Sequence, residues 1–260
     1  GRIYRMHAKN AKPSKPFDYS KLSTTELFNL LGHPNKWHRQ TAQRLIADRR
    51  DASVIPDLTR EFMNFKGQIA LEVFWAINHS GGFTPEFAQK TLTHTNPFVR
   101  FWTIRLLGDS HLMTPTLRSQ LTVLAGSEQN AEVRSCLAAS CKRWAAKDSF
   151  PILAKLIRRE EDVKDKHIPL LLWWAIEDKS TSNLTEVTKL LRDPSIWKTS
   201  MMQQHLLPRL AQRYGAEPTG PNLAMAGALF SLAPTAADKD RLVIGLETGL
   251  KGGVAKEPPL

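Results

Sequence analysis

One pattern recurs along this chain at intervals of about 32 residues, and it constrains the possible fold more than any other feature. Each copy begins with Asn or Asp, carries a basic or polar residue about four positions later, and has apolar residues near positions seven and ten. Asn and Asp are favoured before a helix because their side chains accept hydrogen bonds from its free N–H groups. The copies begin near residues 35, 64, 96, 130, 162 and 194.

A second amphipathic segment lies between successive copies, with apolar residues at three- and four-residue spacing. A repeated pair of helices cannot cover its own apolar faces, so neighbouring pairs must stack. The sequence therefore predicts an all-α fold, a HEAT-like α-solenoid of about six to seven helical hairpins. The intervening helices are expected at 24–31, 54–63, 85–92, 117–124, 152–157 and 184–191, with a last pair at 223–232 and 236–250.

The first residues do not share this pattern. Residues 1–6 have the β-branched and aromatic content of a strand, and a lone strand is not stable. We therefore expect a short N-terminal strand remnant of an upstream domain, followed by a linker that contains Pro13 and Pro16. The predicted boundaries are 1–19 for the upstream end and linker, 20–250 for the repeat domain, and 251–260 for a linker to a downstream domain.

The charge balance is basic, with 36 Lys and Arg against 25 Asp and Glu, a net charge of +11. Much of the excess lies in the first 16 residues, which hold five basic residues and no acidic one. The remaining bias is mild, which favours a solvated basic surface and leaves nucleic-acid binding as an alternative. The longest uncharged apolar run, residues 168–176, is too short to cross a bilayer, so no transmembrane segment is predicted.

Basic residues occupy one position in successive copies and would form a ladder in a stacked structure. A long basic stem can cover apolar surface while its charged head bonds a neighbouring carbonyl or carboxylate. The alternative is a basic stripe that contacts phosphates. The members of this predicted ladder are Arg39, Arg100, Arg134, Lys166 and Lys198.

Seven tryptophans lie in the capped helices of these copies, where they are expected to fill space between hairpins. The alternative is a set of exposed aromatic residues for partner docking or base stacking. Trp173 and Trp174 are adjacent and point about 100° apart on a helix, so they cannot both face one packing layer. Together with Glu177, they are the candidates for a contact with another domain.

No motif for metal, nucleotide or acyl-transfer chemistry occurs, because HExxH, paired CxxC, P-loop, GxGxxG and GxSxG patterns are all missing from the sequence. Acidic residues near helix ends, including Asp109, Glu161 and Asp162, are expected to cap helices or to be solvated. The two cysteines, Cys136 and Cys141, are expected to be buried and unpaired. We assign no catalytic, cofactor-binding or metal-binding residue.

Four segments together resemble the PVC-type haem-binding CxxCH proteins: residues 1–5, 33–45, 99–109 and 168–177. In that family a sugar-dehydrogenase-like β-propeller precedes a HEAT-repeat region, which is followed by a c-type cytochrome domain. The resemblance implies that residues 1–19 end the propeller, that the flanking propeller and cytochrome are the partners, and that the location is extracytoplasmic. It implies haem c only in a downstream domain, because this chain has no CxxCH.

The expected function is a non-catalytic scaffold that spaces and docks a dehydrogenase-like propeller and a cytochrome. One alternative is a nucleic-acid-binding HEAT protein similar to DNA glycosylases, which needs a catalytic acid that the sequence does not single out. A second alternative is a generic protein-interaction adaptor, which differs only in its partner.

Overall fold

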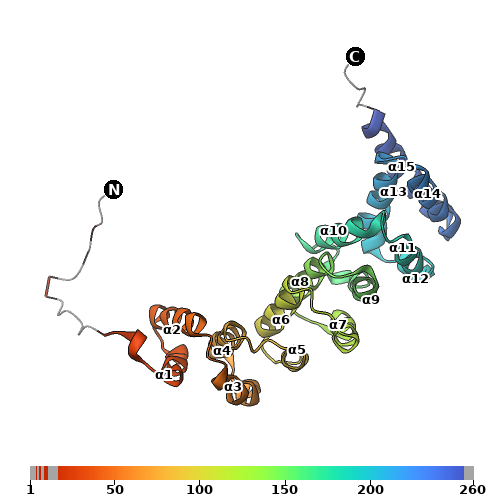
Figure 1. Cartoon of the computed structure of the whole chain (residues 1–260). Coiled ribbons are helices and arrows are strands. Elements are labelled where there is room, and N and C mark those ends of the chain that lie inside the picture. The colour runs from red at the N-terminus through yellow and green to blue at the C-terminus, as the bar shows by residue number, and fades with distance from the viewer. Residues whose placement is uncertain (1–3, 5, 7–8, 11–16, 255–260) are drawn as a thin grey trace. The chain divides into compact units, whose positions relative to one another are not determined.

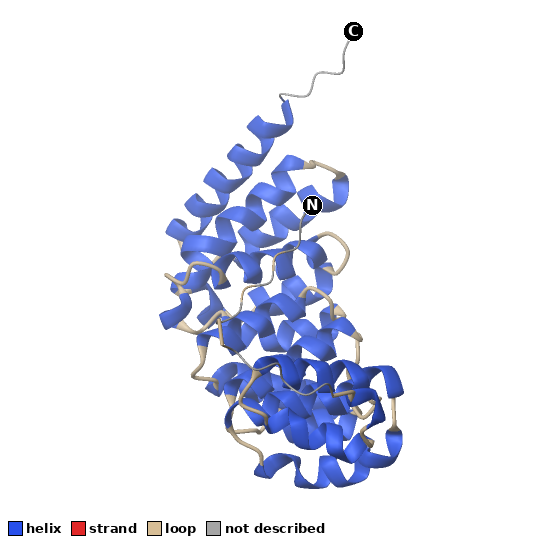
Figure 2. Cartoon of the chain, turned by 90° about the vertical axis from the view of Figure 1, so that its left-hand side faces the viewer, coloured by secondary structure: helices blue, strands red, loops and turns tan. Residues whose placement is uncertain are grey.

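The computed structural model describes residues 4, 6, 9–10 and 17–254, and these residues are predominantly helical (Figure 2). They form fifteen α-helices, with short 3-10 turns and one π-helix, and contain no strand. The all-α prediction is thus confirmed for the described part of the chain. None of its helices combines the length and apolar character needed to cross a membrane.

The strand expected at residues 1–6 falls mainly outside the described residues. Only Tyr4 and Met6 are described there, and neither has regular secondary structure. Most of the predicted linker at 7–19 also lies outside the described residues, as does the end of the predicted linker at 251–260.

The chain divides into two compact units, Gly1–Gly82 and Phe83–Leu260. In the first unit, α2 packs against both α1 and α4, and α3 packs against α4. Its buried core includes Leu27, Ile46, Phe62 and Phe74, and the rings of Phe62 and Phe74 have centroids 6.1 Å apart. The helices of this unit are α1 (Thr24–Asn29), α2 (Lys36–Arg49), α3 (Ile55–Glu61) and α4 (Gly67–His79).

In the second unit, helices that alternate along the chain pack into two rows (Figure 1). One row runs α5, α7, α9, α11, α14, and the other runs α6, α8, α10, α13, α15, with each helix contacting the next in its row. The first row comprises α5 (Pro85–Thr91), α7 (Pro115–Ser127), α9 (Ala146–Leu156), α11 (Leu184–Leu191) and α14 (Gly220–Leu232). The second row comprises α6 (Pro97–Asp109), α8 (Ala131–Cys141), α10 (Ile168–Ser180), α13 (Leu207–Ala216) and α15 (Ala236–Val254).

A single hydrophobic core runs through this second unit between the two rows. It includes both cysteines, which are buried free thiols as the sequence predicted. Trp197 and Tyr214 are among its largest fully buried side chains. The indole N–H of Trp197 donates to the Leu191 carbonyl, and the Tyr214 hydroxyl donates to the Ser180 carbonyl, so both polar groups are satisfied within the core.

Local sequence explains where several helices begin. The side chains of Asn35, Asn96 and Asn130 accept backbone N–H bonds at the starts of α2, α6 and α8, as predicted. Pro97 occupies the first residue of α6, where its missing N–H is not needed. The expected cap at Asn64 is wrong, because α4 begins only at Gly67 and the Asn64 amide donates to Glu61.

The start of α10 also differs from the prediction. Asp165, rather than Asp162, accepts the backbone N–H groups of His167 and Ile168. Asp162 is buried and pairs with a residue of the preceding helix in the row, so it is not available as a cap. The fifth copy is therefore offset by about three residues from the predicted register.

The sixth copy is interrupted rather than a regular helix. A short helix, α12 (Pro194–Trp197), is followed by a π-helix, Met202–Leu206, that leads into α13. Pro208 stands in the first turn of α13 and cannot donate a backbone hydrogen bond. The wider π turn precedes this proline and carries the chain into the next helix of the row.

Candidate functional site

Three arginines of the predicted ladder make the same set of contacts in three different hairpins. The Nη1 of each donates to two backbone carbonyls in the loop before its own helix. The Nε of each donates to a carboxylate of the following hairpin. The pairs are Arg39 with Glu72 at 3.0 Å, Arg100 with Glu128 at 2.7 Å, and Arg134 with Asp162 at 2.6 Å.

The carboxylates of these pairs are shielded from solvent, and pairing shifts the pKa of one member in two of them. Burial would raise the pKa of Glu128, but hydrogen bonds from Arg100 and from the backbone N–H of Asn130 outweigh it, so its pKa lies below the ordinary glutamate value. The hydrogen bond to Asp162 raises the pKa of Arg134. The three guanidinium groups are thus committed to internal contacts, which leaves little of their hydrogen-bonding capacity for a phosphate.

The two lysines of the predicted ladder do not occupy the equivalent position. Lys166 lies in the bend before α10 begins, and Lys198 follows the last residue of the short α12. Both side chains are exposed. The reason is local. Because α10 starts about three residues later than predicted and the helix is interrupted after α12, these lysines do not lie at the helix position that the repeat pattern predicted.

The tryptophans divide between core and surface. Trp144 and Trp197 are buried, whereas Trp37 and Trp174 expose 53% and 45% of their surface. Trp144 lies in the turn after α8 rather than within a helix, which corrects the expectation that all seven are helical. Its indole N–H donates to the Leu107 carbonyl and ties that turn to α6.

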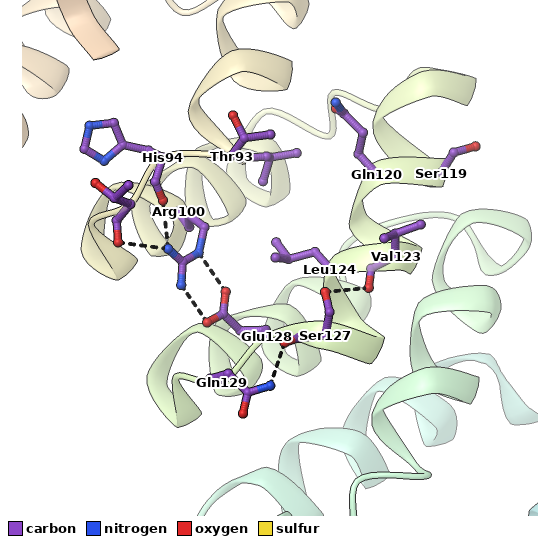
Figure 3. A pocket seen from close by; sticks show the side chains of 12 residues that line it. Thr93, His94, Arg100, Ser119, Gln120, Val123, Leu124, Ser127, Glu128 and Gln129 are labelled. Carbon is purple, nitrogen blue, oxygen red and sulfur yellow. Dashed lines mark hydrogen bonds and ion pairs between the residues drawn. The ribbon is translucent and has the colours of Figure 1, made fainter. Parts of the chain in front are cut away.

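One pocket lies between the α5–α6 loop, α7 and the α7–α8 loop, and has a volume of about 630 Å³ (Figure 3). Figure 3 shows Arg100 on one wall, directed toward Glu128 and the His94 carbonyl. Val123, 70% exposed, lies on the α7 wall. Because the charged groups of this pocket are already paired, its remaining surface suits an apolar side chain rather than an ion.

A second pocket, about 290 Å³, lies between α10 and α13 and includes two of the three predicted contact residues. Trp173 and Glu177 line it from α10, and Trp173 is nearly buried. Trp174 does not line it and is exposed on α10. The remaining lining residues, all on α13, are Arg209, Gln212, Arg213 and Ala216.

The described residues show neither a metal-binding cluster nor a thiol whose environment favours the thiolate. No group of three or more His, Cys, Asp or Glu side chains is arranged to hold a metal ion in residues 17–254 or the few described residues before them. The rings of His33 and His38 have centroids 4.1 Å apart, but Nδ1 of His38 faces the Tyr19 hydroxyl and Nδ1 of His33 accepts the Asn35 N–H. Burial raises the pKa of the Cys136 thiol to about 12, which disfavours the nucleophilic thiolate.

The expectation that the basic heads bond neighbouring carbonyls or carboxylates is confirmed for these three arginines, but the sequence did not identify which acids are the partners. Asp162 was expected to cap a helix or to be solvated, and instead it is buried beside Arg134. A signal for these partners does exist, because the acid follows its arginine by 28 residues in two cases and by 33 in the third. Arg209 and Arg213 were also missed, and they follow no repeat spacing.

Comparison with known proteins gives no relative: no family model, no curated protein and no solved structure matches this chain significantly.

Proposed function

We propose that this chain is a non-catalytic scaffold, a HEAT-like α-solenoid that holds other protein domains at a fixed spacing. The observation that carries the proposal is the repeated bond between an arginine and an acid of the following hairpin, at Arg39, Arg100 and Arg134. Each such bond links successive hairpins by charge-assisted hydrogen bonds that resist displacement. A row joined in this way is suited to maintain a distance rather than to catalyse a reaction.

The packing within residues 83–254 supports the same function. Each helix of a row contacts the next, and one core runs between the rows. In repeat proteins of this kind, extended surfaces serve as binding surfaces while the core holds the spacing. On the resemblance to PVC-type haem-binding CxxCH proteins, the proposed partners are an upstream propeller and a downstream cytochrome domain in an extracytoplasmic parent protein. Haem c would then belong to the cytochrome domain.

Nucleic-acid binding is the weaker alternative. It needs basic groups that face outward in a groove together with a catalytic or stacking group. The three arginines that would form such a stripe are bound to carboxylates, and Lys166 and Lys198 are not aligned with them. Fluorescence anisotropy with labelled duplex DNA at physiological ionic strength should give no saturable binding, and tight salt-dependent binding would favour this alternative.

Cross-linking of the parent protein tests the scaffold directly. Lysine cross-links should join residues 17–254 to both flanking domains in the intact protein, identified by mass spectrometry. A complete reading frame should encode propeller blades upstream and a CxxCH motif downstream. Cross-links confined within the repeat region would contradict the scaffold, and a reading frame without those domains would contradict the expected parent.

Activity measurements provide an independent check. The purified chain should not reduce a dye acceptor in the presence of sugar substrates, whereas the parent protein with its other domains should. Turnover by the isolated chain would overturn the non-catalytic proposal.

A further inference from the structure

The pocket between α10 and α13 has a polar composition that none of the roles above uses. Arg209, Gln212, Arg213 and Ala216 are spaced so that they fall on one face of α13. Trp173 and Glu177, four residues apart, form the facing side on α10. The two helices are neighbours in the same row, so the walls of the pocket are held by regular structure.

The two arginines of this pocket are in different electrostatic situations. Arg213 pairs with Glu217 at 3.0 Å and lies 3.9 Å from a carboxylate oxygen of Glu177. Arg209 makes no ion pair or hydrogen bond with another described residue, and its Nη1 is buried without a partner. A buried donor left unbonded is unfavourable, and more so when it is charged, so Arg209 contributes a cation that lacks its acceptor.

We propose that this pocket binds a carboxylate side chain from an acidic segment of a partner protein, and that Arg209 is the residue that recognises it. The planar guanidinium group presents paired N–H donors that match the two oxygens of a carboxylate. This inference rests on the proposed scaffold function, because it names the chemistry of a partner that the scaffold would hold.

The charge within the pocket selects a carboxylate over a phosphate. Arg213 is paired with Glu217 and faces Glu177, so Arg209 is the lining cation left without a counterion, and one monoanionic group matches its single charge. A phosphate group, close to dianionic at neutral pH, would place its extra charge near Glu177. Glu217, which also binds Arg213, adds to that repulsion.

The aromatic residues favour a protein segment over a small carboxylate in solution. Trp173 lines the pocket, and the next residue along α10, Trp174, exposes 45% of its surface. Tryptophan and arginine are enriched among the residues that dominate binding energy in protein interfaces. The Gln212 side chain also supplies an amide donor and acceptor that can bond the backbone of an extended segment.

Titration with capped peptides tests the proposal. The probes are two peptides blocked at both ends, one with a central glutamate flanked by apolar residues and one with glutamine in its place. NMR of the indole N–H signals and the arginine Nε–H signals should show saturable shifts of Trp173 and Arg209 with the glutamate peptide. The glutamine peptide should bind at least about tenfold more weakly. Equal binding of both peptides, or no saturable shift with the first, would overturn the proposal.

Two variants separate the pocket from general charge. Arg209→Gln should weaken binding of the glutamate peptide by about tenfold or more. It should not lower the thermal unfolding midpoint, because it removes a cation that has no partner within the protein. Arg192→Gln removes an exposed charge from the end of α11, outside the pocket, and should leave binding unchanged. Equal losses in both variants would mean that only the overall charge attracts the peptide, which contradicts the proposal.

Inorganic phosphate and the parent protein provide the remaining comparisons. Phosphate and acetate are compared as competitors of the bound glutamate peptide. If phosphate displaces the peptide at a lower concentration than acetate does, the pocket is a phosphate site and the carboxylate proposal is wrong. If the glutamate peptide fails to bind while cross-links still join the chain to its flanking domains, the pocket assignment is wrong and the scaffold function stands. If the peptide binds and the cross-links are absent, the pocket assignment stands and the scaffold function is wrong.

Discussion

At the scale of single residues, the buried pair of Arg134 and Asp162 has the largest expected effect on stability. Removing one member of a buried pair leaves the other charge uncompensated, which typically costs about 3–5 kcal/mol. We expect Arg134→Met to lower the free energy of unfolding by about that amount in urea denaturation, because Asp162 is only 1% exposed. The double variant Arg134→Met/Asp162→Leu should be more stable than the single variant.

An exposed pair on α6 is the matched control for that experiment. Arg105 and Asp109 are bonded at 2.9 Å, and both side chains are nearly half exposed. Arg105→Met should therefore change the free energy of unfolding by less than about 0.5 kcal/mol. Similar losses at Arg105 and Arg134 would mean that burial does not set the strength of these pairs.

The pH dependence of stability reports on Glu128. Its pKa in the folded chain is lower than its ordinary value of 4.5, so the folded state favours the carboxylate. Its contribution is fully present above the unfolded pKa and is lost as the pH falls through the folded pKa. We expect the stability difference between wild type and Glu128→Gln to narrow as urea unfolding is repeated from about pH 7 to about pH 3. A difference that stays constant with pH would exclude this contribution.

At the scale of whole elements, α13 and α15 approach each other through small residues. A Cβ added to Gly245 or Gly249 would overlap the carbonyl oxygens of Pro208 and Gln212, and one added to Gly215 would lie 2.6 Å from the Leu246 carbonyl oxygen. The backbones of the two helices are therefore close enough that only a hydrogen fits at these positions.

Alanine substitutions test this close contact. Gly249→Ala should destabilise the chain by about 1–3 kcal/mol, because the added methyl group must push the helices apart. Gly227→Ala is the control on α14, where an added Cβ meets no atom within 4 Å, and it should stabilise the helix by up to about 1 kcal/mol. Thermal unfolding followed by circular dichroism distinguishes the two variants, because the unfolding midpoint should fall for Gly249→Ala and rise for Gly227→Ala.

Helix positions were predictable where the signal is local. The interval 184–191 matches α11 at both ends, and Asn96 with Pro97 marks the start of α6, because caps and apolar spacing act within a few residues. The role of Asp162 was not predictable in this way. Two aspartates, Asp162 and Asp165, precede α10, and the contact that distinguishes them comes from Arg134, 28 residues upstream.

The candidate pocket shows the same limit. Trp173 belongs to an unusual pair of adjacent tryptophans, and Glu177 follows this pair on the same predicted helix, so both could be singled out from the sequence. Arg209 and Arg213 were not found, because the π-helix before α13 sets which face of that helix meets α10. A π turn shifts the register of all later residues, and apolar periodicity in the sequence does not locate it.

At the scale of the whole molecule, the excess of positive charge has little to do with the arginine pairs. The net charge is +11, yet three of the most buried basic groups are neutralised by acids of the following hairpin. These pairs therefore add nothing to the excess, and a net charge of this kind governs solubility and long-range attraction more than the fold. An acidic partner segment would be attracted by that field and then recognised at a specific pocket.

Hydrogen exchange tests whether the effect of a lost arginine pair stays local. In a repeat protein each unit contacts only its neighbours, so disruption of one contact should spread only along the row. We expect Arg134→Met to increase amide exchange in α8 and α10, which contact each other, while α2 and α4 of the first unit keep their protection. Mass spectrometry of exchanged peptides resolves these segments. An equal increase in every helix would indicate one cooperative globule, and the proposed solenoid would then be wrong.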